Sequence, residues 1–154
     1  MAQKPRHILL ADDDPDDIEL FREALKEVTQ DVVLTTTDNG ARVLGMLSLL
    51  KPDLIFLDIN MPVMNGMDCL FKIRQMPEHS DVPVVIYSTA ADDKFIRKTF
   101  QLGANRYLKK PNSFEIIKSC LAEILQVPAN ALLQPQHPGD FYVSNCWANF
   151  LLPG

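Results

Sequence analysis

The chain has 154 residues, of which 47% are hydrophobic and 23% are charged, and its formal net charge is −5 at pH 7. This length suits one domain with a modest extension, and no apolar run approaches the roughly 20 residues of a transmembrane helix. Residues 1–7 lack the layout of a secretory signal. The acidic balance argues against direct nucleic-acid binding, because phosphate contacts need a basic surface. We therefore expect a cytoplasmic protein without a membrane segment.

The cysteines give no sign of a metal site. Cys69, Cys120 and Cys146 show no CxxC spacing, and no histidines are spaced as co-ligands. Their odd number also argues against a disulfide framework, so we expect reduced cysteines that serve packing or lie at the surface.

Short apolar runs alternate with segments of helical period up to about residue 126, which predicts repeated βα units around a parallel sheet. The middle three runs are almost uninterrupted, as expected for strands covered on both faces. Right-handed crossovers then give an open, doubly wound α/β sheet with functional groups at the carboxyl ends of its strands. The five predicted strands are Ile8–Ala11, Val32–Thr35, Leu54–Leu57, Val84–Tyr87 and Arg106–Leu108.

The clearest helix signal follows the first strand. Asp14 suits an N-cap, Pro15 suits the first helical position, and the apolar residues from Ile18 to Val28 fall on one helical face. Four further helices are predicted: one at Ala41–Leu50, one after Gly66, one from about Asp92-Asp93, and a last one that carries Phe114, Ile117, Leu121 and Ile124.

From about Val127 the chain becomes Pro-rich and irregular, so we divide it into a main domain of residues 1–126 and a tail of residues 127–154. The tail carries too many aromatic and leucine side chains for a typical disordered segment. Three alternatives are open: the tail docks on its own domain, packs against a second chain in a homodimer, or stays disordered until a partner arrives.

Acidic residues mark two strand ends. Asp12, Asp13 and Asp14 follow the first strand and Asp58 ends the third, so in a parallel sheet these groups converge. Clustered carboxylates repel one another unless a cation compensates them. Oxygen ligands of this kind suit Mg²⁺, which in turn attracts a phosphoryl group.

Two more strand ends carry groups that can contact phosphate. Ser88 and Thr89 close the fourth strand, and Lys110 closes the fifth. A hydroxyl can donate to a phosphoryl oxygen, and a lysine can pair with another as a point charge. No glycine-rich nucleotide loop follows any strand, so a nucleotide cofactor is not expected.

Residues 7–126 resemble the receiver domain of two-component response regulators. The most specific stretch is Leu57–Gly66, LDINMPVMNG, which is similar to the phosphoacceptor segment of that family. The resemblance implies a flavodoxin-like sheet with strand order 2-1-3-4-5 and a C-terminal extension. It also implies a stand-alone signalling switch, because no output domain is evident in the tail.

The resemblance implies a role for each site residue. Asp58 would be the phosphoacceptor, taking its phosphoryl group from a histidine kinase or a histidine phosphotransfer protein. Asp13, Asp58 and the Asn60 carbonyl would ligate Mg²⁺, with Asp12 acting through water, and Lys110 would pair with Asp58 and then with the phosphoryl group. The protein would catalyse only its own phosphorylation and dephosphorylation, and would signal by altered binding to a downstream protein.

In the family pattern, switching uses a hydroxyl at the end of the fourth strand and an aromatic side chain on the fifth. In this sequence these residues would be Ser88 and Tyr107. Two alternatives are open: a one-residue slip in the strand would make Thr89 the hydroxyl, and Tyr107 would otherwise be an ordinary half-buried strand aromatic.

The fourth predicted helix carries a basic face. Lys94, Arg97 and Lys98 share one face of this helix, which suits either an acidic partner or plain solvation.

The alternative to a receiver domain is an aspartate-nucleophile, Mg²⁺-dependent phosphatase of the dehalogenase type, since Asp12-Asp13-Asp14 satisfies its DxD spacing. That class would need a cap insertion, for which the short connections leave no room.

Overall fold

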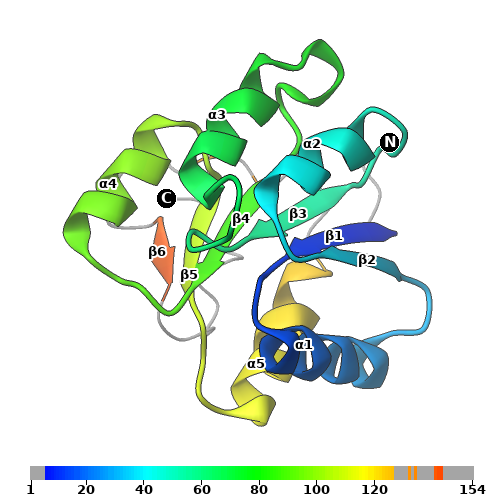
Figure 1. Ribbon diagram of the computed structural model, residues 1–154. Helices are drawn as coiled ribbons and strands as arrows, with labels where there is room; N and C mark the ends of the chain where they lie inside the picture. The colour runs from blue at the N-terminus through cyan, green and yellow to red at the C-terminus, as the bar shows by residue number, and fades with distance from the viewer. Residues whose placement is uncertain (1–5, 127–131, 133, 135–140, 144–154) are drawn as a thin grey trace.

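The computed structural model describes residues 6–126, 132, 134 and 141–143 (Figure 1). Strands and helices alternate along the chain as the sequence predicts. Their bounds are β1 (His7–Ala11), α1 (Pro15–Val28), β2 (Val33–Thr37), α2 (Gly40–Leu47), β3 (Leu54–Leu57), α3 (Gly66–Gln75), the 3₁₀ turn η1 (Pro77–His79), β4 (Val84–Ser88), α4 (Asp93–Gln101), β5 (Arg106–Lys109), α5 (Phe114–Ile124) and β6 (Tyr142–Val143).

All strand pairs of the sheet are parallel, and the strand order is β2-β1-β3-β4-β5-β6. The predicted flavodoxin-like α/β fold with order 2-1-3-4-5 is confirmed, and β6 adds a strand beyond β5. The expectation that the middle three runs are covered on both faces is right for β3 and β4, which are buried throughout. It is wrong for β2, because that strand lies at the edge of the sheet and leaves Val33 exposed.

Helices cover both faces of the sheet. In Figure 1, α1 and α5 lie on one side, while α2, α3 and α4 lie on the other. On the α1 side, the ring of Phe21 meets the rings of Phe56 and Tyr87 edge-on, with centroids 5.0 and 5.7 Å away. Burial of these apolar side chains holds the strands in place, so that their carboxyl ends form one rigid edge.

The helix starts are fixed by polar side chains. Asp14 is the N-cap of α1, and its carboxylate accepts a hydrogen bond from the Asp16 backbone N–H at 2.9 Å, as predicted. Asn39, Asn65 and Ser113 cap α2, α3 and α5 in the same way. These bonds satisfy backbone donors that a helix start otherwise leaves without a partner.

The tail contributes to the sheet. Phe141 and Val143 are fully buried, and β6 pairs with β5 along Tyr107 and Leu108. The Gln134 side chain donates to the carbonyls of Phe100, in the last turn of α4, and Ala104, which follows that helix, at 2.6 and 2.9 Å. For the tail residues that the structure describes, docking on the own domain is the alternative that fits; Trp147 and the last leucines lie outside the described residues.

The cysteines differ from expectation at one position. Cys69 is free and buried, as expected of a packing residue. Cys120 is disulfide-bonded, so the expectation of reduced cysteines is wrong there. None of the helices in the described ranges has the length and apolar character needed to cross a bilayer.

Candidate functional site at the carboxyl ends of the strands

Two buried carboxylates stand side by side at the ends of neighbouring strands. The Asp58 backbone N–H donates to the Ala11 carbonyl at 2.9 Å, and the Asp12 N–H donates to the Thr37 carbonyl at 3.0 Å. These bonds extend the sheet ladder past the ends of β3 and β1. Because Asp12 is fully buried and Asp58 is only 5% exposed, bulk water solvates neither carboxylate well.

Asp13 completes an acidic cluster with them. Asp12, Asp13 and Asp58 each offer a carboxylate oxygen, and these atoms lie within 4.8 Å of one another. Asp12 Oδ2 is buried and has no hydrogen-bond partner, although an ammonium lies near it. A buried oxygen of this kind, in an all-oxygen set, fits a hard divalent cation such as Mg²⁺ or Mn²⁺.

The ammonium belongs to Lys110, which follows β5. Its Nζ lies 2.7 Å from Asp12 Oδ2, 2.8 Å from Asp17 Oδ2 and 3.1 Å from Asp58 Oδ2. The side chain of Lys110 is only 7% exposed, so these contacts are poorly screened by solvent. Lys110 thereby joins β1, α1 and β3 across the strand ends.

Electrostatics at the site leave excess negative charge. Burial raises the pKa of Asp12 to about 6, the charge of Asp58 adds to this, and pairing with Lys110 opposes it. Burial alone would lower the pKa of Lys110, but its close contacts with Asp12 and Asp17 and the charge of Asp58 outweigh burial, so this pKa lies above its usual value. Among the described residues, three carboxylates contact the ammonium and that of Asp13 lies beside two of them, so the site favours a cation.

The connection after Asp58 is tightly built. The Gly66 N–H donates to the Ile59 carbonyl at 2.8 Å, and a Cβ on Gly66 would lie 2.1 Å from the Asp58 carbonyl oxygen. Val63 is exposed and has a positive φ of 66°, in a turn closed by a 2.7 Å bond from the Met64 N–H to the Pro62 carbonyl. Only glycine at position 66 lets α3 begin this close to Asp58.

The switch residues predicted from the sequence lie near each other. Ser88 ends β4 and is fully buried, while Thr89 is exposed. The Tyr107 hydroxyl donates to the Ala90 carbonyl at 2.7 Å, and the Ala90 N–H donates to Ser88 Oγ at 3.2 Å. Burial raises the pKa of Tyr107, while a hydrogen bond with the Ser88 side chain acts in the opposite direction. Tyr107 is fully buried, rather than a half-buried strand aromatic.

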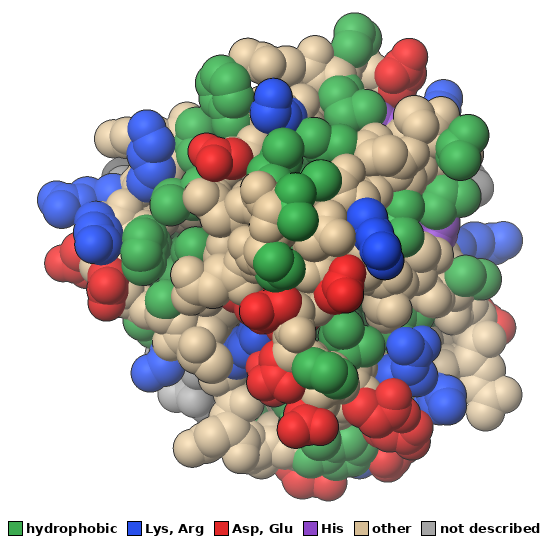
Figure 2. Space-filling view, viewed as in Figure 1, with side chains coloured by type: hydrophobic (Ala, Val, Ile, Leu, Met, Phe, Trp, Pro, Cys, Tyr) green, Lys and Arg blue, Asp and Glu red, His purple; other side chains and the backbone are tan. Residues whose placement is uncertain are grey.

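Basic and acidic side chains gather over different parts of the face shown in Figure 2. Basic side chains gather over α4, at the left of the view, and acidic ones gather lower down, over α1. Lys94, Arg97 and Lys98 are all exposed on α4, as the sequence predicts.

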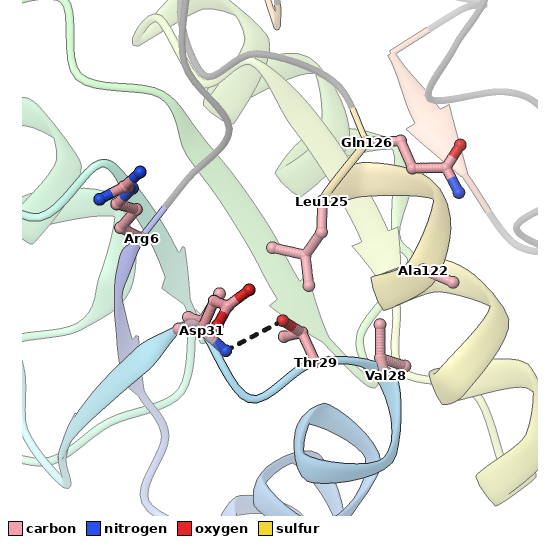
Figure 3. A pocket seen from close by; sticks show the side chains of 8 residues that line it. Arg6, Val28, Thr29, Asp31, Ala122, Leu125 and Gln126 are labelled. Carbon is pink, nitrogen blue, oxygen red and sulfur yellow. Dashed lines mark hydrogen bonds between the residues drawn. The ribbon is translucent and has the colours of Figure 1, made fainter.

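A separate cavity of about 690 Å³ lies at the amino ends of the strands, between the ends of α1 and α5 (Figure 3). Val28, Ala122 and Leu125 give it apolar walls, and Arg6 and Asp31 stand at its rim. Among the described residues, it shares no lining residue with the acidic cluster.

Sequence reasoning places most of the site but misses one contact. The structure brings Asp12, Asp13, Asp58 and Lys110 together, and Asn60 is exposed in the connection between β3 and α3. It also brings in Asp17, which the sequence shows only as part of an acidic run. The signal that could have found it is position: Asp17 is the third residue of α1, where side chains point back toward the helix start.

Comparison with known proteins gives a consistent result. The family model described as response regulator receiver domain matches residues 8–122. The probable C4-dicarboxylate response regulator DctR of Halalkalibacterium halodurans is 33% identical over 124 residues, which is 80% of this chain and 53% of that protein. The chain thus spans about half the length of this curated relative.

Solved structures agree with the sequence comparison. The Mn²⁺-bound form of response regulator Rcp1 superposes with a TM-score of 0.74 at 28% identity, covering 80% of this chain and 96% of that one. The phosphorylated cyanobacterial phytochrome response regulator RcpA superposes with a TM-score of 0.72 at 29% identity, covering 80% and 91%. Nothing in these matches supports the alternative of a dehalogenase-type phosphatase.

Proposed function

The chain belongs to the response regulator receiver domain family, and from this we propose that it is a Mg²⁺-dependent phosphoacceptor switch that is phosphorylated on Asp58. One observation carries the proposal: Asp58 lies in a carboxylate cluster within 4.8 Å of Asp12 and Asp13, and Lys110 bonds to it at 3.1 Å. The solved relatives include one structure bound to Mn²⁺ and one that is phosphorylated, which supports both halves of the proposal.

The proposed reaction moves a phosphoryl group from a phosphohistidine to an aspartate. An Asp58 carboxylate oxygen attacks phosphorus, a P–O bond forms and the P–N bond breaks. The electron pair stays on the leaving imidazole nitrogen, which then takes up a proton. The donor is a histidine kinase or a histidine phosphotransfer protein, so the chain catalyses only its own phosphorylation and dephosphorylation.

The chain's residues act mainly by charge and position. Lys110 already lies at the Asp58 carboxylate and can pair with a phosphoryl oxygen once the acyl phosphate forms. Ser88 offers a hydroxyl at the next strand end and is linked to Tyr107 through Ala90, which suits a hydroxyl and an aromatic that switch together. When bound by Asp12, Asp13, Asp58 and the Asn60 carbonyl, Mg²⁺ would neutralise the charge that develops on the transferred group.

The output is proposed to be altered protein binding in the cytoplasm, without direct nucleic-acid contact. The exposed basic face of α4, formed by Lys94, Arg97 and Lys98, suits an acidic partner surface. Charge reversal at these three positions should weaken binding of such a partner, and unchanged affinity for every partner would reject this role. The homodimer expected as one alternative from the sequence stays a prediction.

We keep the division into a receiver domain of residues 1–126 and a tail of residues 127–154 as part of the proposal. The family match over residues 8–122 supports the first part.

The test is phosphorylation by a small acyl-phosphate donor in the presence of Mg²⁺. We expect a mass gain of one phosphoryl group that hydroxylamine removes, because hydroxylamine cleaves acyl phosphates. Asp58→Asn should abolish the gain. Asp68→Asn is the matched control, because it removes the same charge from an exposed position on α3 and should leave the gain intact. A stable gain in Asp58→Asn would refute the proposal.

A further inference from the structure

The ammonium of Lys110 is shared between two kinds of carboxylate. Asp12 and Asp58 belong to the acidic cluster that can hold a metal ion, whereas Asp17 stands outside that cluster. Asp17 nevertheless makes the shorter of the two hydrogen bonds that Nζ forms with carboxylates, 2.8 Å against 3.1 Å for Asp58. A residue of α1 therefore takes part in holding the ammonium of the pocket.

The donor count makes this contact consequential. An ammonium has three donors and no acceptor. Two donors point to Asp17 and Asp58, and Asp12 Oδ2 lies 2.7 Å from the same nitrogen. Lys110 therefore cannot contact an incoming phosphoryl oxygen unless one of these carboxylates releases it.

Asp17 is the carboxylate that can release Lys110 most easily. Its side chain is 28% exposed, so water can replace the ammonium, whereas the side chain of Asp12 is fully buried and that of Asp58 is 7% exposed. Asp17 also sits in the first turn of α1, whose positive end stabilises a carboxylate left without its partner.

We propose that Asp17 is a positioning residue for Lys110, which holds the ammonium on the α1 side of the pocket and competes with the phosphoryl group for it. This inference rests on the proposed function, because it assigns the competitor at the same site. In the unphosphorylated protein, Asp17 keeps the ammonium from neutralising Asp12 and Asp58 fully, which leaves these carboxylates free to bind a cation. After phosphorylation, Lys110 has to leave Asp17 for the phosphoryl oxygen.

The proposal predicts opposite changes for cation and phosphoryl binding. In Asp17→Asn, the ammonium should settle closer to Asp12 and Asp58 and compete with Mg²⁺, so the Mg²⁺ affinity should fall about fivefold. The affinity for beryllofluoride at saturating Mg²⁺ should rise about fivefold, because the phosphoryl mimic no longer competes with Asp17. Calorimetric titration measures both affinities.

Two controls separate this role from a general loss of charge. Asp16→Asn removes the same charge from the same helical turn, but the Asp16 side chain is exposed and has no ion pair among the described residues. It should change either affinity by less than about twofold. Asp17→Asn should also be combined with Lys110→Met, in which the effect on Mg²⁺ affinity should vanish if Asp17 acts through Lys110.

The outcomes are decisive, and they distinguish failure of this proposal from failure of the proposed function. A Mg²⁺ effect that persists in the Lys110→Met background, or no effect in the wild-type background, overturns the role of Asp17. If wild-type protein does not bind beryllofluoride, the phosphoacceptor function fails, while the Mg²⁺ titrations still decide whether Asp17 acts through Lys110.

Discussion

The ring of Tyr107 packs edge-on against the ring of Phe141 with centroids 6.2 Å apart, and the Tyr107 N–H donates to the Phe141 carbonyl at 2.9 Å. Both residues are fully buried. The proposed switch aromatic is thus packed against a strand that comes from the tail. Because a rotation of the Tyr107 ring changes its packing against Phe141, we expect the described part of the tail to contribute to both stability and switching.

Phe141→Ala tests the contribution of the tail strand to stability. Phe141 also packs against Phe100 of α4, with ring centroids 5.2 Å apart, so its removal should leave a cavity between α4 and β5. We expect the free energy of unfolding to fall by about 3 kcal/mol, measured by urea denaturation. Phe71→Ala is the matched control, because Phe71 is 50% exposed and its loss should cost less than about 1 kcal/mol. Equal losses in the two variants would contradict a packed tail strand.

Asp12→Asn should stabilise the protein at pH 8 in the absence of divalent cations. The pKa of Asp12 is raised from 3.8 to about 6, so the folded state binds a proton more tightly than the unfolded state between these values. Stability therefore falls as the pH rises through this window, and the cost stays constant above it. Lys110 keeps its hydrogen bonds to Asp17 and Asp58, so the substitution does not leave a buried ammonium alone.

The expected gain is about 2 kcal/mol at pH 8, from thermal or urea unfolding, and it should disappear below about pH 4. Saturating Mg²⁺ should stabilise the wild type more than the variant, because it binds only where the carboxylates are intact. If the variant is no more stable than the wild type at pH 8, ionised Asp12 does not destabilise the metal-free protein.

The parts of this structure that follow from sequence are those with a local cause. Asp14 and Pro15 mark the start of α1 because capping and a fixed φ act within one turn. The meeting of Asp12 with Asp58 follows from the parallel order of β1 and β3, which apolar runs and crossover rules predict.

The missed parts depend on tertiary contacts. The position of Asp17 in the first turn of α1 directs its side chain toward the helix start, but the partner that it meets there, Lys110 after β5, depends on how the sheet is assembled. The strand β6 has two residues, too few for a period, and it forms because the edge of β5 offers backbone partners and apolar neighbours. Such a strand is visible only once the sheet is built.

Gly66→Ala should damage both stability and the phosphoacceptor site. The added Cβ would lie 2.1 Å from the Asp58 carbonyl oxygen and 2.9 Å from Ile59 Cα, both backbone atoms that cannot rotate away. The start of α3 must then move away from β3, which we expect to cost more than about 2 kcal/mol of unfolding free energy and to slow phosphorylation of Asp58. Gly45→Ala is the matched control, because Gly45 lies within α2 and a Cβ there meets nothing within 4 Å. It should stabilise the protein by up to about 1 kcal/mol, since alanine favours helix over glycine, and leave phosphorylation unchanged. If Gly66→Ala were as stable and as readily phosphorylated as Gly45→Ala, the close packing of α3 against Asp58 would not be what shapes the site.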